Sequence, residues 1–234
     1  MKSKRTLKIC VDIAMITALL FLMAYSLIGE TAHEWIGIAM LILFVMHHML
    51  NSRWARNIFN GKYTVVRVWQ TVLVFAVLVC MAGSMLSGIV LSRHVFSFLP
   101  IRTGQGWART MHLLCAYWGL VVMSLHIGFH FSILTGMVRK HIGEQSAKYI
   151  WLIRIASIGI AIYGVIAFAN RQISSYMFMK NEFVFFDFEE PMVLFLIDYL
   201  AIMGLFVFIG HYFTKLLKWF KLRRKYGEGL SVEK

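Results

Sequence analysis

Six long apolar stretches are the feature that most constrains how this chain can fold. They cover about residues 9–28, 32–51, 65–91, 111–136, 150–169 and 191–214. A helix needs about 20 mostly apolar residues to cross a bilayer, and each stretch reaches this length. We therefore expect an all-α, polytopic membrane bundle of about six transmembrane helices, forming a single membrane domain over residues 1–234.

The composition excludes several other protein classes. The chain is 59% hydrophobic and 15% charged, with a mean hydropathy of +0.70. A soluble domain is nearer to half apolar and a quarter charged, so a soluble enzyme, a disordered chain and a disulfide scaffold are excluded. Cys10, Cys80 and Cys115 stand far apart, and no CxxC is present. A zinc ribbon, a thioredoxin-like motif and a c-type haem attachment site are therefore excluded too.

The basic residues predict the orientation in the membrane. If the N-terminus lies inside, 19 of the 24 Lys and Arg residues fall on the inner side. The other five, Arg93, Arg102, Arg109, Arg171 and Lys180, fall outside. Because cytoplasmic loops are enriched in Lys and Arg, we expect both termini inside a bacterial cytoplasmic membrane. The net charge of +13 then reflects topology and attraction to lipid head groups, and nucleic acid is not an expected partner.

Four histidines form two pairs with the same spacing. His33 and His47 lie 14 residues apart on the second stretch, and His112 and His126 lie 14 residues apart on the fourth. Fourteen residues make just under four helical turns, so both members of a pair share a face and are ~21 Å apart along the axis. Both stretches run from outside to inside, which places His33 level with His112 and His47 level with His126.

This arrangement predicts two stacked b-type haems. Ionisable residues inside a membrane are costly and by default indicate a functional site. A neutral imidazole is a strong axial ligand for haem iron, and a bis-histidine haem needs one from each side. We expect His33 and His112 to bind the iron of an outer haem, and His47 and His126 that of an inner haem. The haem core would be a four-helix unit over about residues 9–136. Helix-to-helix hydrogen bonding is the plainer explanation for a single membrane histidine.

The inner layer leaves alternatives open. Measured from His33, His47 is offset by about −40° and the adjacent His48 by about +60°, so His48 is an alternative ligand. His130 shares a face with His112 but lies ~27 Å from it along the axis. We interpret it as a residue beside the inner haem or its propionates, or as an ordinary interfacial histidine.

Other residues are candidates for holding the rest of a haem. Arginine pairs well with carboxylates such as propionates. The candidates are Arg93, Arg102 and Arg109 on the outer side and Arg53 on the inner side, and plain interfacial anchoring is the alternative for each. Gly119, midway between His112 and His126, would let a macrocycle lie close to the helix. Small-residue helix packing explains this glycine equally well.

Several short sequence segments resemble those of a known family. They are ETAHEWIG (30–37), MHH (46–48), SGIVLSRHVFSFLP (87–100), ARTMHLLCAYWG (108–119), SLHIGFH (124–130) and NEFVFFDFEEP (181–191). The paired histidines resemble the haem core of the cytochrome b superfamily and of ferric-reductase-like membrane domains. The chain is more closely similar, over about residues 8–214, to the flavinylation-associated cytochromes, a bacterial family formerly catalogued as a domain of unknown function.

The resemblance implies a function in electron transport. It implies a b-type cytochrome that carries electrons to partner flavoproteins, some with covalently attached FMN, and axial roles for His33, His47, His112 and His126. No FAD or NAD fingerprint follows the last stretch, and no flavinylation acceptor sequence is present. We therefore expect an electron-transfer subunit of an oxidoreductase system without a substrate-converting site of its own. Quinone is a further candidate as cofactor and as electron donor.

A transition-metal transporter is the alternative function. Imidazole binds zinc, copper, iron and nickel alike. Such a transporter typically gathers histidines with carboxylates or thiols at one depth near the middle of the membrane. This chain distributes its paired histidines over two depths instead.

Two aspartates and one loop carry weaker signals. Asp12 lies in the first stretch and Asp198 in the sixth. Buried carboxylates can relay protons, and Asp198 would matter if a quinone site were found. The aromatic and acidic segment 176–190 is expected on the outer side, as an interfacial segment or as a docking surface for a partner.

Overall fold

The computed structural model describes residues 2–101, 103–142, 147–181, 183–184, 186–187 and 189–229. Side chains are described for these residues except 2–3, 133–142, 147–150 and 224–229. The described chain is helical, with α1 (Lys2–Met23), α2 (Tyr25–Ile28), α3 (Glu30–Leu50), α4 (Ser52–Arg56), α5 (Val65–Leu91), α6 (Gln105–Ile142), α7 (Ala147–Asn170), α8 (Ile173–Met177) and α9 (Met192–Gly229).

Six of these helices are long and apolar enough to cross a membrane, namely α1, α3, α5, α6, α7 and α9. The predicted all-α bundle of six spans is therefore confirmed. Several helix ends differ from the predicted stretches. The first stretch breaks at Ala24, and Gly29 turns the chain into α3 with a φ of +83°, a left-handed conformation that glycine adopts without steric cost. Gly104 has a φ of +81°, and α6 begins directly after it at Gln105 rather than at 111.

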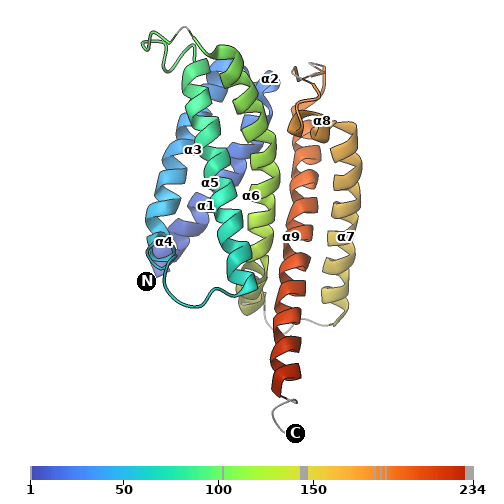
Figure 1. Ribbon diagram of the computed structural model, residues 1–234. Helices are drawn as coiled ribbons and strands as arrows, with labels where there is room; N and C mark the ends of the chain where they lie inside the picture. The colour runs from blue at the N-terminus through green and yellow to red at the C-terminus, as the bar shows by residue number, and fades with distance from the viewer. Residues whose placement is uncertain are drawn as a thin grey trace.

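The helices form two groups that share α6. In Figure 1, α1, α3, α5 and α6 gather on one side of the bundle, and α9 and α7 stand on the other. The closest helix pairs are α1 with α3, α5 with α6, α6 with α9, and α7 with α9. By comparison, α3 approaches α5 only loosely. Both termini lie at the lower end in this view, and the short helix α8 lies at the upper end (Figure 1).

Glycines set the close contacts of α9 with its two neighbours. A Cβ atom at Gly128 of α6 would lie 2.4 Å from the carbonyl oxygen of Val207 on α9. A Cβ atom at Gly164 of α7 would lie 2.4 Å from the carbonyl oxygen of Ala201, also on α9. Small residues allow such close backbone approach, and this packing holds helices together in lipid. The position of α9 therefore depends on residues that have no side chain.

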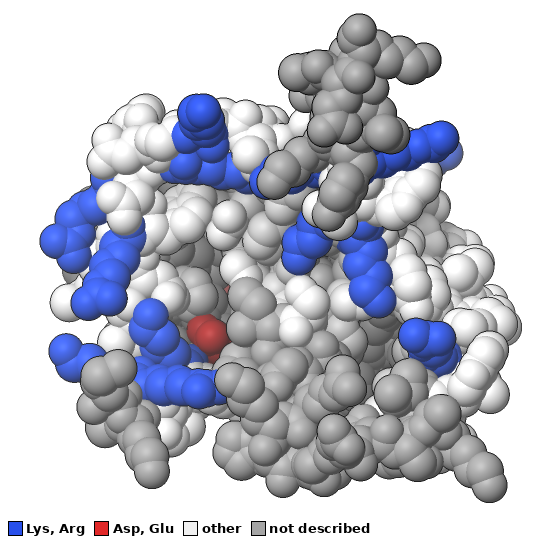
Figure 2. Space-filling view, turned by 90° about the horizontal axis from the view of Figure 1, so that it is seen from below, with Lys and Arg blue, Asp and Glu red and all other residues white. Residues whose placement is uncertain are grey.

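Basic residues surround the face that carries both termini. Figure 2 shows this face from below, with Lys and Arg spread around its edge and acidic surface visible in a hollow between them. The charge distribution agrees with the asymmetry read from the sequence. The assignment of this face to the cytoplasm stays a prediction.

Replacing Gly128 by alanine tests the α6–α9 contact. The new methyl group would overlap the Val207 carbonyl, so the two helices must separate. Overpacking of this kind typically costs about 1–3 kcal/mol, and we expect a clearly lower melting temperature for Gly128→Ala in detergent. Gly159→Ala on α7 is the matched control, because a Cβ atom there meets nothing within 4 Å. Equal melting temperatures for the two variants would contradict the contact.

Candidate functional site

The outer histidines meet across the gap between α3 and α6. The ring centroids of His33 and His112 lie 5.9 Å apart, with an angle of 66° between the ring planes. The ring of Tyr25 packs edge-on against His33, with 5.1 Å between centroids. The predicted pairing of these two histidines at one depth is therefore present in the fold.

Their separation matches that of two ligands on one metal ion. A metal–imidazole bond is about 2.0–2.1 Å long and the nitrogen lies about 1 Å from the ring centre, so two imidazoles on opposite sides of one ion have centroids about 6 Å apart. The observed 5.9 Å is close to this value. The Nδ1 atom of His33 is also buried without a hydrogen-bond partner, which is unusual for a ring nitrogen inside a protein. The outer pair thus brings two imidazole rings, each a potential metal ligand, into contact at one depth.

Small residues of α5 orient His112. Its Nδ1 lies 3.0 Å from the carbonyl oxygen of Ser84 and 3.1 Å from Oγ of Ser87. The Ser87 hydroxyl donates a 2.6 Å hydrogen bond to the carbonyl of Gly83, so it is itself fixed. A carbonyl can only accept, which assigns the ring proton of His112 to Nδ1 and leaves the lone pair on Nε2. This arrangement is typical of metal-binding histidines.

Glu34 ties the turn after α5 to the outer end of α3. Its carboxylate accepts hydrogen bonds from Oγ of Ser92 at 2.6 Å, from the backbone N–H of Arg93 at 2.8 Å and from that of Val95 at 2.7 Å. The backbone N–H of His94 donates to the same carboxylate. Because α3 and α5 otherwise pack loosely, this interaction sets how far α3, with His33, stands from the α5–α6 pair.

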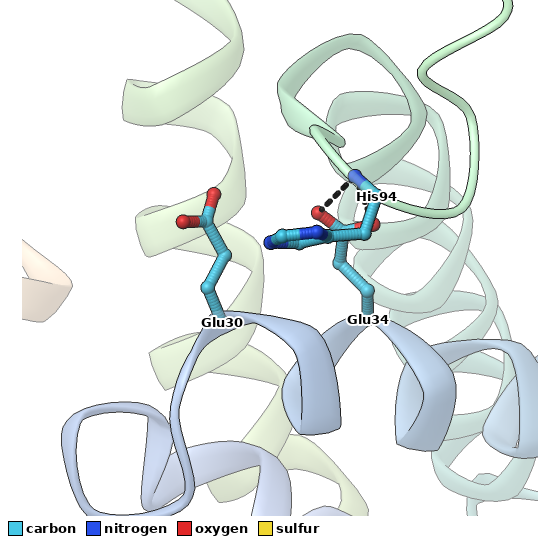
Figure 3. Close-up of side chains that lie close together, drawn as sticks. All are labelled: Glu30, Glu34 and His94. Atoms are coloured by element: carbon cyan, nitrogen blue, oxygen red, sulfur yellow. Dashed lines mark hydrogen bonds between the residues drawn. The ribbon is translucent and has the colours of Figure 1, made fainter.

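The same turn brings His94 next to two carboxylates. Figure 3 shows the ring of His94 lying between Glu30 and Glu34. Ligand atoms of the three residues all lie within 4.8 Å of one another, so they could hold a metal ion. Both oxygens of Glu34 already accept hydrogen bonds from the turn, and Glu30 pairs with Arg93 at 3.5 Å. We therefore interpret this cluster as the anchor of the outer loop.

The inner histidines form a wider cluster with an aspartate. Nδ1 of His47 lies 2.7 Å from Oδ1 of Asp12, which comes from α1. The rings of His126 and His130 are in contact, with 5.0 Å between centroids. His130, His47, Asp12 and His48 all lie within electrostatic range of His126. The Nδ1 atom of His126 is buried and has no hydrogen-bond partner.

His47 and His48 have different surroundings. His48 is exposed, and its Nδ1 bonds the carbonyl oxygen of Phe44 on its own helix at 2.9 Å. His47 is 28% exposed and is held by another helix through Asp12. Among the described side chains, His47 and His126 make no ring contact like that of the outer pair. The inner residues thus lie in one region of the structure, but the rings of the predicted pair, His47 and His126, are not in direct contact.

Among the described residues, the arginines predicted to bind propionates are exposed and make no hydrogen bond to the paired histidines. Arg93 is 71% exposed and pairs with Glu30, and Arg109 is exposed. Arg53 is exposed beside a surface cavity of about 360 Å³ next to α4. Arg102 lies outside the described residues. A Cβ atom at Gly119 would lie 3.6 Å from Cβ of Cys80 on α5, so this glycine faces a helix neighbour.

An ion-pair network lies between α7 and α9. Arg171 donates to Glu190 through both terminal nitrogens and to Oδ2 of Asp198 through Nε at 2.8 Å. The hydroxyl of Tyr163 donates to Oδ1 of Asp198 at 2.5 Å. The hydrogen bonds to Glu190, and then those to Asp198, raise the pKa of Arg171 above its ordinary value. Asp198, a candidate proton relay in the sequence, is therefore held in a salt bridge.

Sequence reasoning missed two roles in this region. It placed Asp12 near the inner end of the first span, as a proton relay or a hydrogen-bonded interfacial residue, but did not pair it with His47, and it gave Glu34 no role. Both residues carried a usable signal, because a carboxylate in or beside an apolar stretch is costly unless it has partners.

Comparison with known proteins adds no identification, since no family model, curated protein or solved structure matches this chain.

Removing the Glu34 carboxylate should loosen the outer turn. The amides of Arg93, His94 and Val95 would lose their acceptor, and at about 1 kcal/mol per bond we expect hydrogen exchange in this segment to speed up about tenfold or more in Glu34→Ala. Exchange followed by mass spectrometry would measure this. Glu30→Ala is the matched control, because Glu30 pairs with the Arg93 side chain and, among the described residues, accepts no hydrogen bond from the backbone of this turn. Unchanged exchange in Glu34→Ala would refute the anchor.

Proposed function

We propose that this protein is a membrane-integral dihaem b-type cytochrome that carries electrons across a bacterial cytoplasmic membrane. The observation that carries the proposal is the meeting of His33 and His112, with 5.9 Å between ring centroids, on two helices that each hold a second histidine 14 residues further along. The proposed outer ligands are His33 and His112, and the proposed inner ligands are His47 and His126.

The surroundings of His112 and His47 support this assignment. Each ring has one nitrogen occupied by an acceptor from another helix, the Ser84 carbonyl for His112 and the Asp12 carboxylate for His47. Such partners hold an imidazole in one orientation and make the other nitrogen the candidate ligand atom. For His47 this atom, Nε2, lies 3.4 Å from Nδ2 of Asn51, a long contact that a bound iron would replace. His47 is therefore favoured over His48, whose ring bonds a carbonyl of its own helix.

The chain's own residues would position and insulate the cofactors. Haem supplies reversible one-electron chemistry when bound, and its potential depends on its ligands and their hydrogen bonds. Ser84 and Ser87 hold His112, Asp12 holds His47, and Glu34 keeps α3 at a set distance from α5. The electron donor we propose is a quinol or a flavoprotein, and the acceptor a flavoprotein, including one with covalent FMN, or another redox partner.

Haem content tests the proposal directly. We expect the purified protein in detergent to show sharp low-spin bands on reduction with dithionite and about two b haems per chain in a pyridine haemochrome assay. Ala variants of His33, His112, His47 and His126 should each lower this to about one haem. His48→Ala should keep both, and His94→Ala is the control for a histidine in the outer loop. A colourless protein, expressed with ample haem, would refute the proposal and favour transition-metal transport instead.

The Asp12→Asn variant tests whether Asp12 acts on a haem through His47 without being needed to bind that haem. The variant keeps the shape of the side chain but loses the negative charge next to His47, so both haems should remain bound. That charge favours the ferric state, and its loss should move the reduction potential of one haem to a more positive value. A redox titration followed optically measures this. Unchanged potentials for both haems would contradict a role of Asp12 at a ligand.

A further inference from the structure

A surface pocket lies where the chain passes from α3 to α5. It has a volume of about 360 Å³ and is lined by α4, by the loop after it and by the first turns of α5. In Figure 1, these segments lie at the lower end of the bundle, on the face that carries both termini. Because α3 ends at Leu50 and α5 begins at Val65, the pocket lies at the level where two membrane spans reach the surface.

The lining of the pocket is rich in hydrogen-bond donors. Two guanidinium groups, one indole and three amide side chains contribute to it, from Arg53, Arg67, Trp54, Asn57, Asn60 and Gln70. Guanidinium and indole N–H groups only donate hydrogen bonds, and an amide side chain donates as well as accepts. No Asp or Glu occurs in the sequence between Glu34 and Glu144. The lining therefore offers donors and positive charge, but no carboxylate to balance them.

Neutral groups of the loop hold Arg67 in place. Its Nη2 donates hydrogen bonds to the carbonyl oxygens of Asn57 at 2.6 Å and of Ile58 at 3.2 Å. Its guanidinium lies over the ring of Tyr63, 4.6 Å from the centroid. Gly61, with a φ of +88°, lets the loop turn close to this side chain, because a Cβ atom there would lie 3.1 Å from Nη1 of Arg67. Among the described residues, the positive charge of Arg67 has no ion-pair partner.

Arg53 brings a second charge to the pocket from α4. Its side chain is exposed and forms no ion pair with another described residue. The planar guanidinium of an arginine matches two oxygens of a phosphate, and hydrogen bonds between charged groups are stronger than those between neutral ones. Two guanidinium groups on one pocket, with amide donors around them, are therefore suited to a phosphate group.

The helices next to the pocket expose apolar side chains toward the membrane. Val45 and Met49 are exposed on the last turns of α3, and Val68 and Val72 are exposed on the first turns of α5. The members of each pair are four residues apart, so they lie on one face of their helix. Trp54 lines the pocket itself, and tryptophan rings are typically found at the level of the lipid head groups. A ligand that joins a phosphate to apolar chains would therefore match both the pocket and the surfaces beside it.

We propose that this pocket binds the phosphate head group of an anionic phospholipid such as phosphatidylglycerol. The phosphate accepts hydrogen bonds from Arg53 and Arg67, and the acyl chains contact the exposed apolar side chains of α3 and α5. Basic pockets between membrane helices bind anionic head groups in this way. A zwitterionic lipid such as phosphatidylcholine carries a cation beyond its phosphate, and the lining has no carboxylate to receive it. The proposal is independent of haem binding.

Native mass spectrometry of the full chain, titrated in detergent with dioleoylphosphatidylglycerol, tests the site. We expect one saturable, high-affinity lipid per chain. Arg53→Gln removes one charge from the pocket and should weaken this binding about fivefold, the usual effect of one basic residue at a membrane surface. Arg56→Gln is the matched control, because it removes the same charge from the same helix but lies outside the lining. The control should bind like the unmodified protein, and Arg53→Lys, which keeps the charge, should bind better than Arg53→Gln.

Two further ligands make the result specific. Phosphatidylcholine with the same acyl chains should bind clearly more weakly than phosphatidylglycerol. Millimolar inorganic phosphate should leave the bound lipid in place, because it gains nothing from the apolar surfaces. Equal binding of the two lipids, or equal affinities of Arg53→Gln and Arg56→Gln, would overturn the lipid site. Displacement of the lipid by inorganic phosphate would also overturn it and would assign the pocket to free phosphate. Equal melting temperatures of the two variants without added lipid would show that a difference in binding comes from the pocket and not from unfolding.

Discussion

An imidazole inside a membrane needs a partner from the protein or from a ligand, because lipid offers no hydrogen bonds. The arrangement of this molecule follows from that constraint. His112 meets the Ser84 carbonyl, His47 meets Asp12, and His48 meets the carbonyl of Phe44. His33 and His126 each keep a buried nitrogen without such a partner. The two incompletely satisfied rings belong to the two layers in which the spacing of the histidines predicts a metal.

The outer and inner layers differ in how firmly their geometry is set. At the outer end, Glu34 joins α3 to the turn after α5, and α5 in turn holds His112 through its serines. At the inner end, the link that reaches His47 comes from α1, its own close neighbour. No comparable interaction joins α3 to α6 there among the described residues. This explains why the outer rings face each other closely and the inner ones spread into a cluster with His130.

The six spans and the depths of the histidines were predictable, because the thickness of a bilayer and the rise of a helix are constants. The contacts between side chains of neighbouring helices could not be predicted, since they depend on how each helix is rotated about its axis in the bundle. Asp12 could be recognised as a carboxylate near the inner end of the first span, but only packing assigns it to His47. Gly119 lies on the side of α6 predicted for it and still faces Cys80, because α5 approaches there. The early start of α6 followed from Gly104, whose backbone conformation no hydrophobic pattern reveals.

The position of α6 between two groups of helices has a consequence for biogenesis. All four histidines of the predicted layers, and every helix that holds them, precede residue 143 in the chain. Arg171, Glu190 and Asp198, which form the ion-pair network between α7 and α9, are synthesised later. The histidine half can therefore assemble in the membrane while the other half is still being translated, and α6 then serves as the surface on which α9 and finally α7 settle. Assembly in this order would complete the ion-pair network between α7 and α9 last.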